Sequence, residues 1–365
     1  MTRKILFLTG TRADFGKLKP LILESQKVAD VDIFVTGMHM LKQYGRTVNE
    51  ILRLQLPVHS YINQDARTPV DIVLANTVHG LSLYLQENPT DLLVIHGDRV
   101  EALAGAIVGN FNGILTAHVE GGELSGTLDG MTRHSITKLA HAHFCANDEA
   151  ARRLMLMGES PATIFAIGSP DIDIMLSPDL PPLAEVLEHY HISERDYGVL
   201  IYHPVWGEDP AQFEQTIRAV NDSGLPFVAI YPNNDPGAQK IIDILERHAD
   251  ELTILPSMRF EYFLTLLKNG KMIVGNSSAG IREAPVYGVP TINIGTRQAG
   301  RAELLSVVNV PDNYDLISQA ISNPPPAVKS LDFGRGDSAR QFVKIISSES
   351  FWKTPRQKKF WEGVE

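Results

Sequence analysis

Short apolar runs alternate with amphipathic stretches along the first half of the chain. Strands that are covered on both faces read as continuous apolar runs, so we expect buried parallel strands at these positions. The expected strands are 4–8, 31–36, 91–95, 114–118, 142–146 and 164–167. Helices are expected between them, including 15–28 and 148–157. Strands that alternate with helices predict an α/β fold with a doubly wound parallel sheet.

The same alternation returns after a proline-containing stretch at 168–182. Further strands are expected at 198–202, 226–231, 252–255, 272–274 and 291–294, and a helix at 338–347. We therefore expect two Rossmann-like domains joined by a linker. The expected boundaries are 1–168 for the first domain, 169–185 for the linker, 186–340 for the second domain, and 341–365 for a C-terminal helix and tail that can pack back on the first domain.

Composition narrows the partners without changing the fold class. The 365-residue chain carries a net charge of −10, which argues against nucleic acid or an anionic membrane surface as partner. No apolar run is long enough to span a membrane. The single cysteine, Cys145, lies between Phe144 and Ala146, so we expect a buried thiol in a strand and a cytoplasmic location.

Two polar motifs each follow an expected strand directly. The first is His96-Gly97-Asp98-Arg99, and the second is 118–123, which contains Glu120 and runs on to Asp129, Arg133 and His134. Ligands of open α/β sheets bind at the carboxyl ends of the strands, and neighbouring strands lie about 5 Å apart. If these two strands are neighbours, Asp98 and Glu120 point into one crevice. Clustered carboxylates with His and Arg beside them are typical of proton transfer.

Three other loops after strands could bind an anion. The segment 10–16 is not a G-x-G-x-x-G dinucleotide motif, and it is either an anion site or a plain turn capped by Asp14. The segment 275–280 could hold a diphosphate or simply begin a helix, and Glu283 could accept two hydrogen bonds from a ribose diol. Arg297 offers a further phosphate contact. Together these loops predict a nucleotide bound in the cleft between the domains.

Three histidines leave alternatives open. His203 ends an expected strand at its carboxyl end, and we count it among the catalytic candidates. His141 and His143 share one face of a strand, but without a third convergent ligand we do not expect a zinc site. They could instead order the loop that carries Glu120.

At this point the combined motifs resemble the hydrolysing UDP-N-acetylglucosamine 2-epimerases, from Lys4 to about Arg301. The matching segments are 12–14, 96–99, 118–123, 129 with 133–134, 136–141, 231–233, 275–278 with 282–283, and 295–298. The resemblance implies a GT-B-like fold with two Rossmann-like domains facing a cleft. It also implies conversion of UDP-N-acetylglucosamine and water to N-acetylmannosamine and UDP for sialic acid synthesis, by elimination and hydration, with no metal and no cofactor.

The resemblance also assigns residues. Its catalytic carboxylates match Asp98, Glu120 and Asp129. Its UDP ligands match Arg12, His203, Ser277, Ser278, Glu283 and Arg297, while Asn233 and Arg99 match further substrate contacts. Gly121-Gly122-Glu123 resembles the hydrolysing branch, because the non-hydrolysing branch typically has Ala-Gly-Leu-Arg there. The expected assembly is a homo-oligomer, either a dimer or a tetramer.

Several alternatives remain open at the level of sequence. The chain has Gly130 where several relatives carry an acidic residue, and related enzymes act on UDP-2,4-diacetamido-2,4,6-trideoxyglucose for legionaminic acid synthesis. A GT-B glycosyltransferase would share the UDP loops but needs no clustered carboxylates. A non-hydrolysing epimerase and a non-catalytic nucleotide-sugar sensor are the other two alternatives.

Overall fold

The computed structural model divides the chain into two compact units, which we describe separately. The first contains Met1–Glu123, Leu128–Ile174 and Asp332–Glu365, and the second is built mainly from Met175–Leu331. The residues that the structure describes are 2–42, 45–65, 67–124, 129–193, 195–205, 207–232, 237–300 and 303–363. Within this part of the chain, no helix combines the length and the apolar character needed to cross a membrane.

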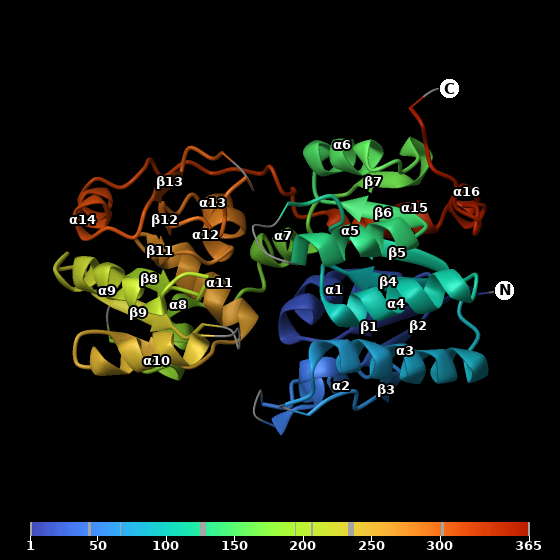
Figure 1. Ribbon diagram of the computed structural model, residues 1–365, viewed down its shortest axis with the longest axis horizontal. Helices are drawn as coiled ribbons and strands as arrows, with labels where there is room; N and C mark the ends of the chain where they lie inside the picture. Colours follow the sequence, from blue (N-terminus) through green and yellow to red (C-terminus); the bar gives the residue numbers. More distant parts are fainter. Residues whose placement is uncertain are drawn as a thin grey trace. The chain divides into compact units, whose positions relative to one another are not determined.

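The first unit contains a seven-stranded parallel sheet in the order β3-β2-β1-β4-β5-β6-β7. Its strands are β1 Lys4–Thr9, β2 Asp30–Val35, β3 Val58–Ser60, β4 Leu92–His96, β5 Leu115–Val119, β6 Ala142–Cys145 and β7 Ile164–Ala166. Its helices are α1 Arg12–Ser25, α2 Val48–Leu52, α3 Val70–Glu87, α4 Val100–Phe111, α5 Asp129–Leu139, α6 Asp148–Leu156, α7 Pro170–Met175, α15 Ser338–Ile346 and α16 Glu349–Trp352, with 3₁₀ turns η1 Gly37–Met40 and η3 Pro161–Thr163 (Figure 1).

The second unit contains a six-stranded parallel sheet in the order β10-β9-β8-β11-β12-β13. Its strands are β8 Gly198–Ile201, β9 Phe227–Ile230, β10 Thr253–Leu255, β11 Ile273–Gly275, β12 Thr291–Ile294 and β13 Val307–Val310. Its helices are α8 Leu183–His189, α9 Phe213–Asn221, α10 Ala238–Arg247, α11 Phe260–Asn269, α12 Ala279–Arg282, α13 Ala284–Tyr287 and α14 Tyr314–Ser322, with η4 Pro210–Gln212 before α9.

The apolar runs form strands where helices cover both faces of the sheet. The side chains of Ile5, Val94 and Ala117 are fully buried in the first sheet, and the strands before the two polar motifs, β4 and β5, are neighbours as expected. The sequence analysis missed β3 and β13. Both lie at a sheet edge, where one side of the strand stays partly exposed and the apolar pattern is weak.

The division between the units falls at 174/175 and 331/332. The domain limits inferred from the sequence, at 168, 185 and 340, stay predictions, because a division of the chain into compact units does not test them.

The C-terminal segment is part of the core of the first unit. Helix α15 packs against α1, and the Phe342 ring lies 6.5 Å from that of Phe7 and 4.6 Å from that of Phe144. Beyond α16, the ammonium group of Lys358 donates hydrogen bonds to the carbonyls that end α5, including that of Ala140 at 2.7 Å. Cationic side chains at a helix C-terminus are favourable, so the tail stabilises the end of α5.

Lys358 also belongs to a buried ionic cluster around Glu159. The Glu159 carboxylate is fully buried and lies 2.5 Å from Lys358, 2.7 Å from Lys138 and 2.9 Å from Nε2 of His143. Burial alone would raise the pKa of Glu159, but the His143 hydrogen bond and the nearby charges lower it to about 2. Glu159 is therefore ionised near neutral pH and requires its cationic partners.

We expect Lys358→Met to lower the free energy of unfolding by about 2 kcal/mol, because Glu159 loses one counter-charge and three carbonyls lose a donor. The exposed neighbour Lys359 is the matched control, and Lys359→Met should change stability by less than about 0.5 kcal/mol. Urea unfolding of both variants measures the difference. Equal stability of the two variants would contradict the role of the tail.

Candidate functional site

The carboxyl ends of β4 and β5 bring the two polar motifs together. His96 of β4 is in register with Val119 of β5, and the next residues of each strand turn away from the sheet. Gly97 has φ +74° and Glu120 has φ +63°, so both occupy the left-handed region. For Glu120 this conformation is unfavourable by about 1–2 kcal/mol. Strained backbone of this kind clusters at functional sites, which makes Glu120 a candidate on structural grounds also.

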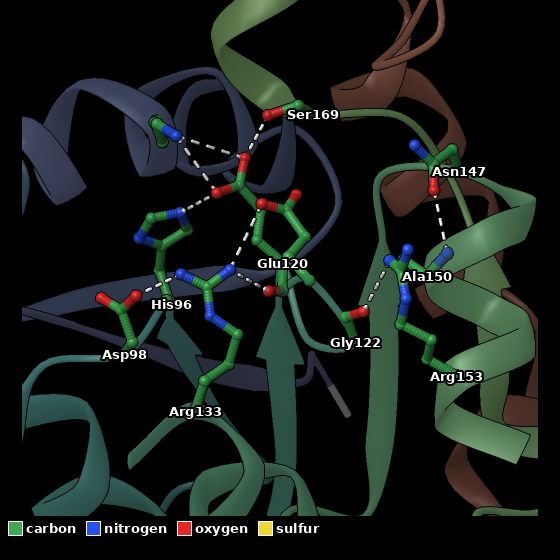
Figure 2. Close-up of polar contacts among 12 residues, drawn as sticks. His96, Asp98, Glu120, Gly122, Arg133, Asn147, Ala150, Arg153 and Ser169 are labelled. Atoms are coloured by element: carbon green, nitrogen blue, oxygen red, sulfur yellow. Dashed lines mark hydrogen bonds and ion pairs between the residues drawn. The ribbon is translucent and has the colours of Figure 1, made fainter. Parts of the chain in front are cut away.

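The Glu120 carboxylate is buried, with its residue 2% exposed, and is held by three donors. Lys17 of α1 approaches it at 3.1 Å, and Nε2 of His96 lies 3.0 Å from the same oxygen, Oε2. The Ser169 hydroxyl donates to the other oxygen, Oε1. Figure 2 shows these contacts converging on the carboxylate from different segments of the first unit. Donors from three directions favour the ionised carboxylate and fix its orientation.

Arg133 of α5 connects the two motifs. Its guanidinium donates to the Asp98 carboxylate, to Glu123 at 3.3 Å and to the main-chain carbonyl of Glu120 at 3.3 Å (Figure 2). Burial disfavours its charge, but Asp98 and Glu123 outweigh burial and raise the pKa of Arg133. The Asp98 side chain is 23% exposed. Asp98 can therefore meet a ligand from solvent, while Glu120 lies deeper.

His118 supports the turn that carries Asp98. Its ring is fully buried, and Nε2 lies 2.8 Å from the Gly97 carbonyl, which only an N–H can satisfy. The other ring nitrogen lies 3.1 Å from the Thr137 hydroxyl. Burial lowers the pKa of His118 to about 3, so the ring is neutral near pH 7 and fixes the turn at Gly97.

A side chain of α1 caps the loop between β1 and α1. The Asp14 carboxylate accepts the N–H groups of Gly10 and Thr11, each at 3.0 Å, and completes a capping box at the start of α1. Asp14 therefore caps this turn, and anion binding by the same turn stays a prediction. Arg12 pairs with Glu50 at 2.8 Å.

Arg99 was predicted to contact the substrate. The side chain is 45% exposed, and its Nε lies 3.4 Å from the buried Glu101.

In the second unit, Asn276 connects two of the predicted anion loops. Its side-chain oxygen accepts the His203 N–H at 2.7 Å, and its amide donates to the His203 carbonyl at 2.8 Å. Its own carbonyl accepts hydrogen bonds from Arg297 at 3.2 Å and Gln298 at 2.8 Å. The sequence analysis treated Asn276 only as part of a loop, but it holds the ends of β8, β11 and β12 in one arrangement.

Burial, and then the charge of Arg297, lower the pKa of His203 to about 3. His203 is therefore a neutral hydrogen-bonding group near pH 7.

The segment after β11 begins a short helix, as one of the two alternatives for it expected. Gly275 has φ +129°, and a Cβ there would lie 2.0 Å from the Ile201 carbonyl oxygen, so only glycine fits. Two short helices follow, α12 and α13, with Glu283 between them. Ser277 accepts the Ala279 N–H at 3.3 Å, while Ser278 makes no capping bond through its side chain.

Two predicted site residues lie outside what the structure describes. Asp129 begins α5, but its side chain lies outside the described part of the chain. The whole of Asn233 lies outside it.

Three residues were missed by the sequence analysis: Lys17, Ser169 and Asp171. Lys17 lies 3.3 Å from the buried Asp171 carboxylate as well as contacting Glu120. Helical spacing from Asp14 was the only sequence signal for Lys17.

His141 and His143 make hydrogen bonds outside the Glu120 loop. Nδ1 of His141 accepts the Thr116 N–H at 3.1 Å and Nε2 lies 3.0 Å from the Arg356 carbonyl, while His143 binds Glu159. In the described ranges, no group of three His, Cys, Asp or Glu side chains is arranged to hold a metal ion. Cys145 is buried as expected, and burial raises its pKa to about 12, so its thiol is unreactive.

Comparison with known proteins identifies the family. The family model for UDP-N-acetylglucosamine 2-epimerase matches residues 22–347. The chain is 45% identical to the UDP-N-acetylglucosamine 2-epimerase of Neisseria meningitidis serogroup B, over 98% of each chain. It is 32% identical to the UDP-N,N'-diacetylbacillosamine 2-epimerase (hydrolyzing) of Legionella pneumophila, over 95% of this chain and 96% of that protein.

The fold agrees with this result. The chain resembles the crystal structure of the Methanocaldococcus jannaschii UDP-GlcNAc 2-epimerase in complex with UDP-GlcNAc and UDP, with a TM-score of 0.79 and 22% identity over 94% of this chain and 99% of that one. The two Rossmann-like parallel-sheet units have the GT-B-like fold that the resemblance implied. The chain belongs to the UDP-N-acetylglucosamine 2-epimerase family.

Arg133→Met should lower the free energy of unfolding by about 3 kcal/mol at pH 8, because Asp98 and Glu123 lose their shared counter-charge. A carboxyl group needs no counter-charge once it is protonated, and carboxyl groups ordinarily titrate at about pH 4. The penalty should therefore be full at pH 8 and smaller in acid.

Urea unfolding at pH 8 and pH 3.5 measures this dependence. Arg153 is the matched control, because it reaches the neighbouring Gly122 carbonyl at 3.3 Å but contacts neither Asp98 nor Glu123 (Figure 2). A penalty for Arg133→Met that is equal at both pH values would contradict the prediction.

Proposed function

We propose that this protein hydrolyses UDP-N-acetylglucosamine with inversion at C2, releasing N-acetylmannosamine and UDP. The observation that carries the proposal is the pair of acidic side chains, Asp98 and Glu120, at the ends of adjacent strands and tied through Arg133. Inversion at a carbon that bears hydrogen requires one group to remove a proton and another to return one to the opposite face.

The chemistry explains why both an acid–base pair and an anion site are needed. No carbonyl is attached directly to C2, so its hydrogen is weakly acidic and leaves as the C1–O bond to UDP breaks. A carboxylate takes the proton, UDP takes the electron pair of the C1–O bond, and a 2-acetamidoglucal remains. Water then adds its oxygen to C1 and gives one proton to a carboxylate, while an acid protonates C2 on the opposite face. We assign these steps to Asp98 and Glu120, with Asp129 assisting at the water or at C2.

The charge that develops on UDP needs cationic and polar groups. We assign this role to Arg12 and Arg297, together with the hydroxyls of Ser277 and Ser278, and the ribose to Glu283. His203 is neutral near pH 7, so we assign it to binding UDP through hydrogen bonds. Asn233 and Arg99 complete the proposed substrate contacts.

Hydrolysis is favoured over simple epimerisation by two observations. The Legionella relative carries the word hydrolyzing in its name and is 32% identical over nearly the whole chain. The Gly121-Gly122-Glu123 segment also supports it: Glu123 contacts Arg133, and Gly122 has φ +81° with no room for a Cβ beside the Ala150 carbonyl.

A second substrate has its own support. The same Legionella relative is named for UDP-N,N'-diacetylbacillosamine, which carries a second acetamido group. A UDP-2,4-diacetamido-2,4,6-trideoxy sugar is therefore the alternative substrate, and the mechanism at C1 and C2 is the same for both.

Incubation with UDP-N-acetylglucosamine in D₂O, followed by proton NMR, tests the function. The proposal expects free N-acetylmannosamine with deuterium at C2, together with UDP. Deuterated UDP-N-acetylmannosamine would mean a non-hydrolysing epimerase. An unchanged spectrum, with turnover of the diacetamido-trideoxy sugar, would assign the alternative substrate.

Asp98→Asn should lower kcat by about 10²-fold or more, since a positioned acid or base contributes roughly 10²–10⁴. Release of UDP at saturating substrate measures the effect. The exposed Asp71 on α3 supplies the control, and Asp71→Asn should retain wild-type turnover. Wild-type turnover of Asp98→Asn would remove Asp98 from the mechanism.

Arg297→Gln should weaken UDP binding about tenfold or more, because a charge-assisted hydrogen bond to a phosphate is lost. Calorimetric titration with UDP gives the Kd. Lys240 is an exposed cation in the same unit, and Lys240→Gln removes the same charge without that contact. If both variants bind UDP equally, Arg297 has no specific role.

A further inference from the structure

Ser169 links the Glu120 carboxylate to the segments that join the two units. It lies just before α7 and is fully buried, and its hydroxyl donates to Oε1 of Glu120 (Figure 2). Neither its residue type nor its position marked it as a site residue in the sequence.

The main chain of Ser169 is held by the returning segment of the chain. Its N–H donates to the Phe333 carbonyl at 2.6 Å, and its carbonyl accepts the Ser338 hydroxyl at 3.2 Å. A Cβ on Gly334 would lie 3.2 Å from the Ser169 nitrogen, so the two backbones are in direct contact. The segment around Ser169 precedes the 174/175 division, and the segment around Phe333 follows the 331/332 division.

A second contact fastens the same junction. The Asp173 carboxylate accepts the N–H groups of Ser338 at 2.9 Å and Ala339 at 2.8 Å, at the beginning of α15. Both passages of the chain between the units are thus tied together within the first unit, and Ser169 is the residue of this junction that reaches Glu120.

We propose that Ser169 is a positioning residue for Glu120: its hydroxyl orients the carboxylate and favours the ionised form, and the junction of the two connecting segments holds that hydroxyl in place. The inference rests on the proposed function in giving Glu120 a role in proton transfer. It adds that the connecting segments help to set the protonation of this group.

The surroundings of Glu120 make the contribution of Ser169 measurable. The carboxylate faces Lys17 from α1, His96 from β4 and Ser169, and Arg133 from α5 binds its main-chain carbonyl. Lys17 is shared with Asp171, which lies 3.3 Å away on α7. Because a hydrogen bond to the charged form lowers a carboxyl pKa, removing the Ser169 donor should raise the pKa of Glu120 by about one unit.

The test compares Ser169→Ala with Ser338→Ala. Both changes remove one buried hydroxyl from the same junction, but only the Ser169 hydroxyl contacts the carboxylate. Carbon-13 NMR of labelled glutamate side chains follows the titration of Glu120, which is assigned by the signal that disappears in Glu120→Gln. Ser169→Ala should shift this titration upward by about one pH unit. Ser338→Ala should shift it much less, because the Ser169 N–H remains bound to the Phe333 carbonyl.

Enzyme kinetics supply an independent measurement. In Ser169→Ala, the acid limb of the profile of kcat/KM against pH should move to higher pH by the same amount. The thermal stability of Ser169→Ala should equal that of Ser338→Ala. An unshifted Glu120 titration, or an equal shift in both variants, would overturn the proposal. The NMR titration needs no substrate, so a wild-type protein that leaves UDP-N-acetylglucosamine intact would refute the proposed function and leave this test valid.

Discussion

The site depends on the buried charge of Glu120. The Glu120 carboxylate has almost no contact with solvent and sits on a left-handed backbone that L-residues disfavour. A charge in such a place is tolerated only when donors surround it. Lys17, His96 and Ser169 come from three separate segments to supply those donors. These three segments of the first unit therefore keep one carboxylate oriented and ionised.

The second unit aligns its loops through a neutral side chain, that of Asn276. Asn276 uses its amide and its carbonyl to align three loops after neighbouring strands, and a neutral His203 lies beside it. A neutral amide can hold loops together without adding a charge to this region. The two units thus differ in electrostatic character, the first built around carboxylates and the second around amide and hydroxyl groups.

Sequence reasoning was most successful where one physical rule dominates. Continuous apolar runs identified the buried strands, and the end of a parallel strand marked Asp98 and Glu120 as candidates. It failed where the outcome depends on packing. The edge strands β3 and β13 lack the apolar pattern. Lys17 and Ser169 could not be found, because their partners lie 103 and 49 residues away and only the folded chain brings them together.

The return of the chain into the first unit has a consequence for biosynthesis. Helix α15 and the tail with Lys358 complete the core and cap α5, yet they follow the entire second unit in sequence. During translation the second unit can fold as soon as it emerges, whereas the first must wait with the surface around Phe7 and Phe144 uncovered. The unit synthesised first is thus the last to be finished, because its apolar face stays exposed until helix α15 has emerged from the ribosome.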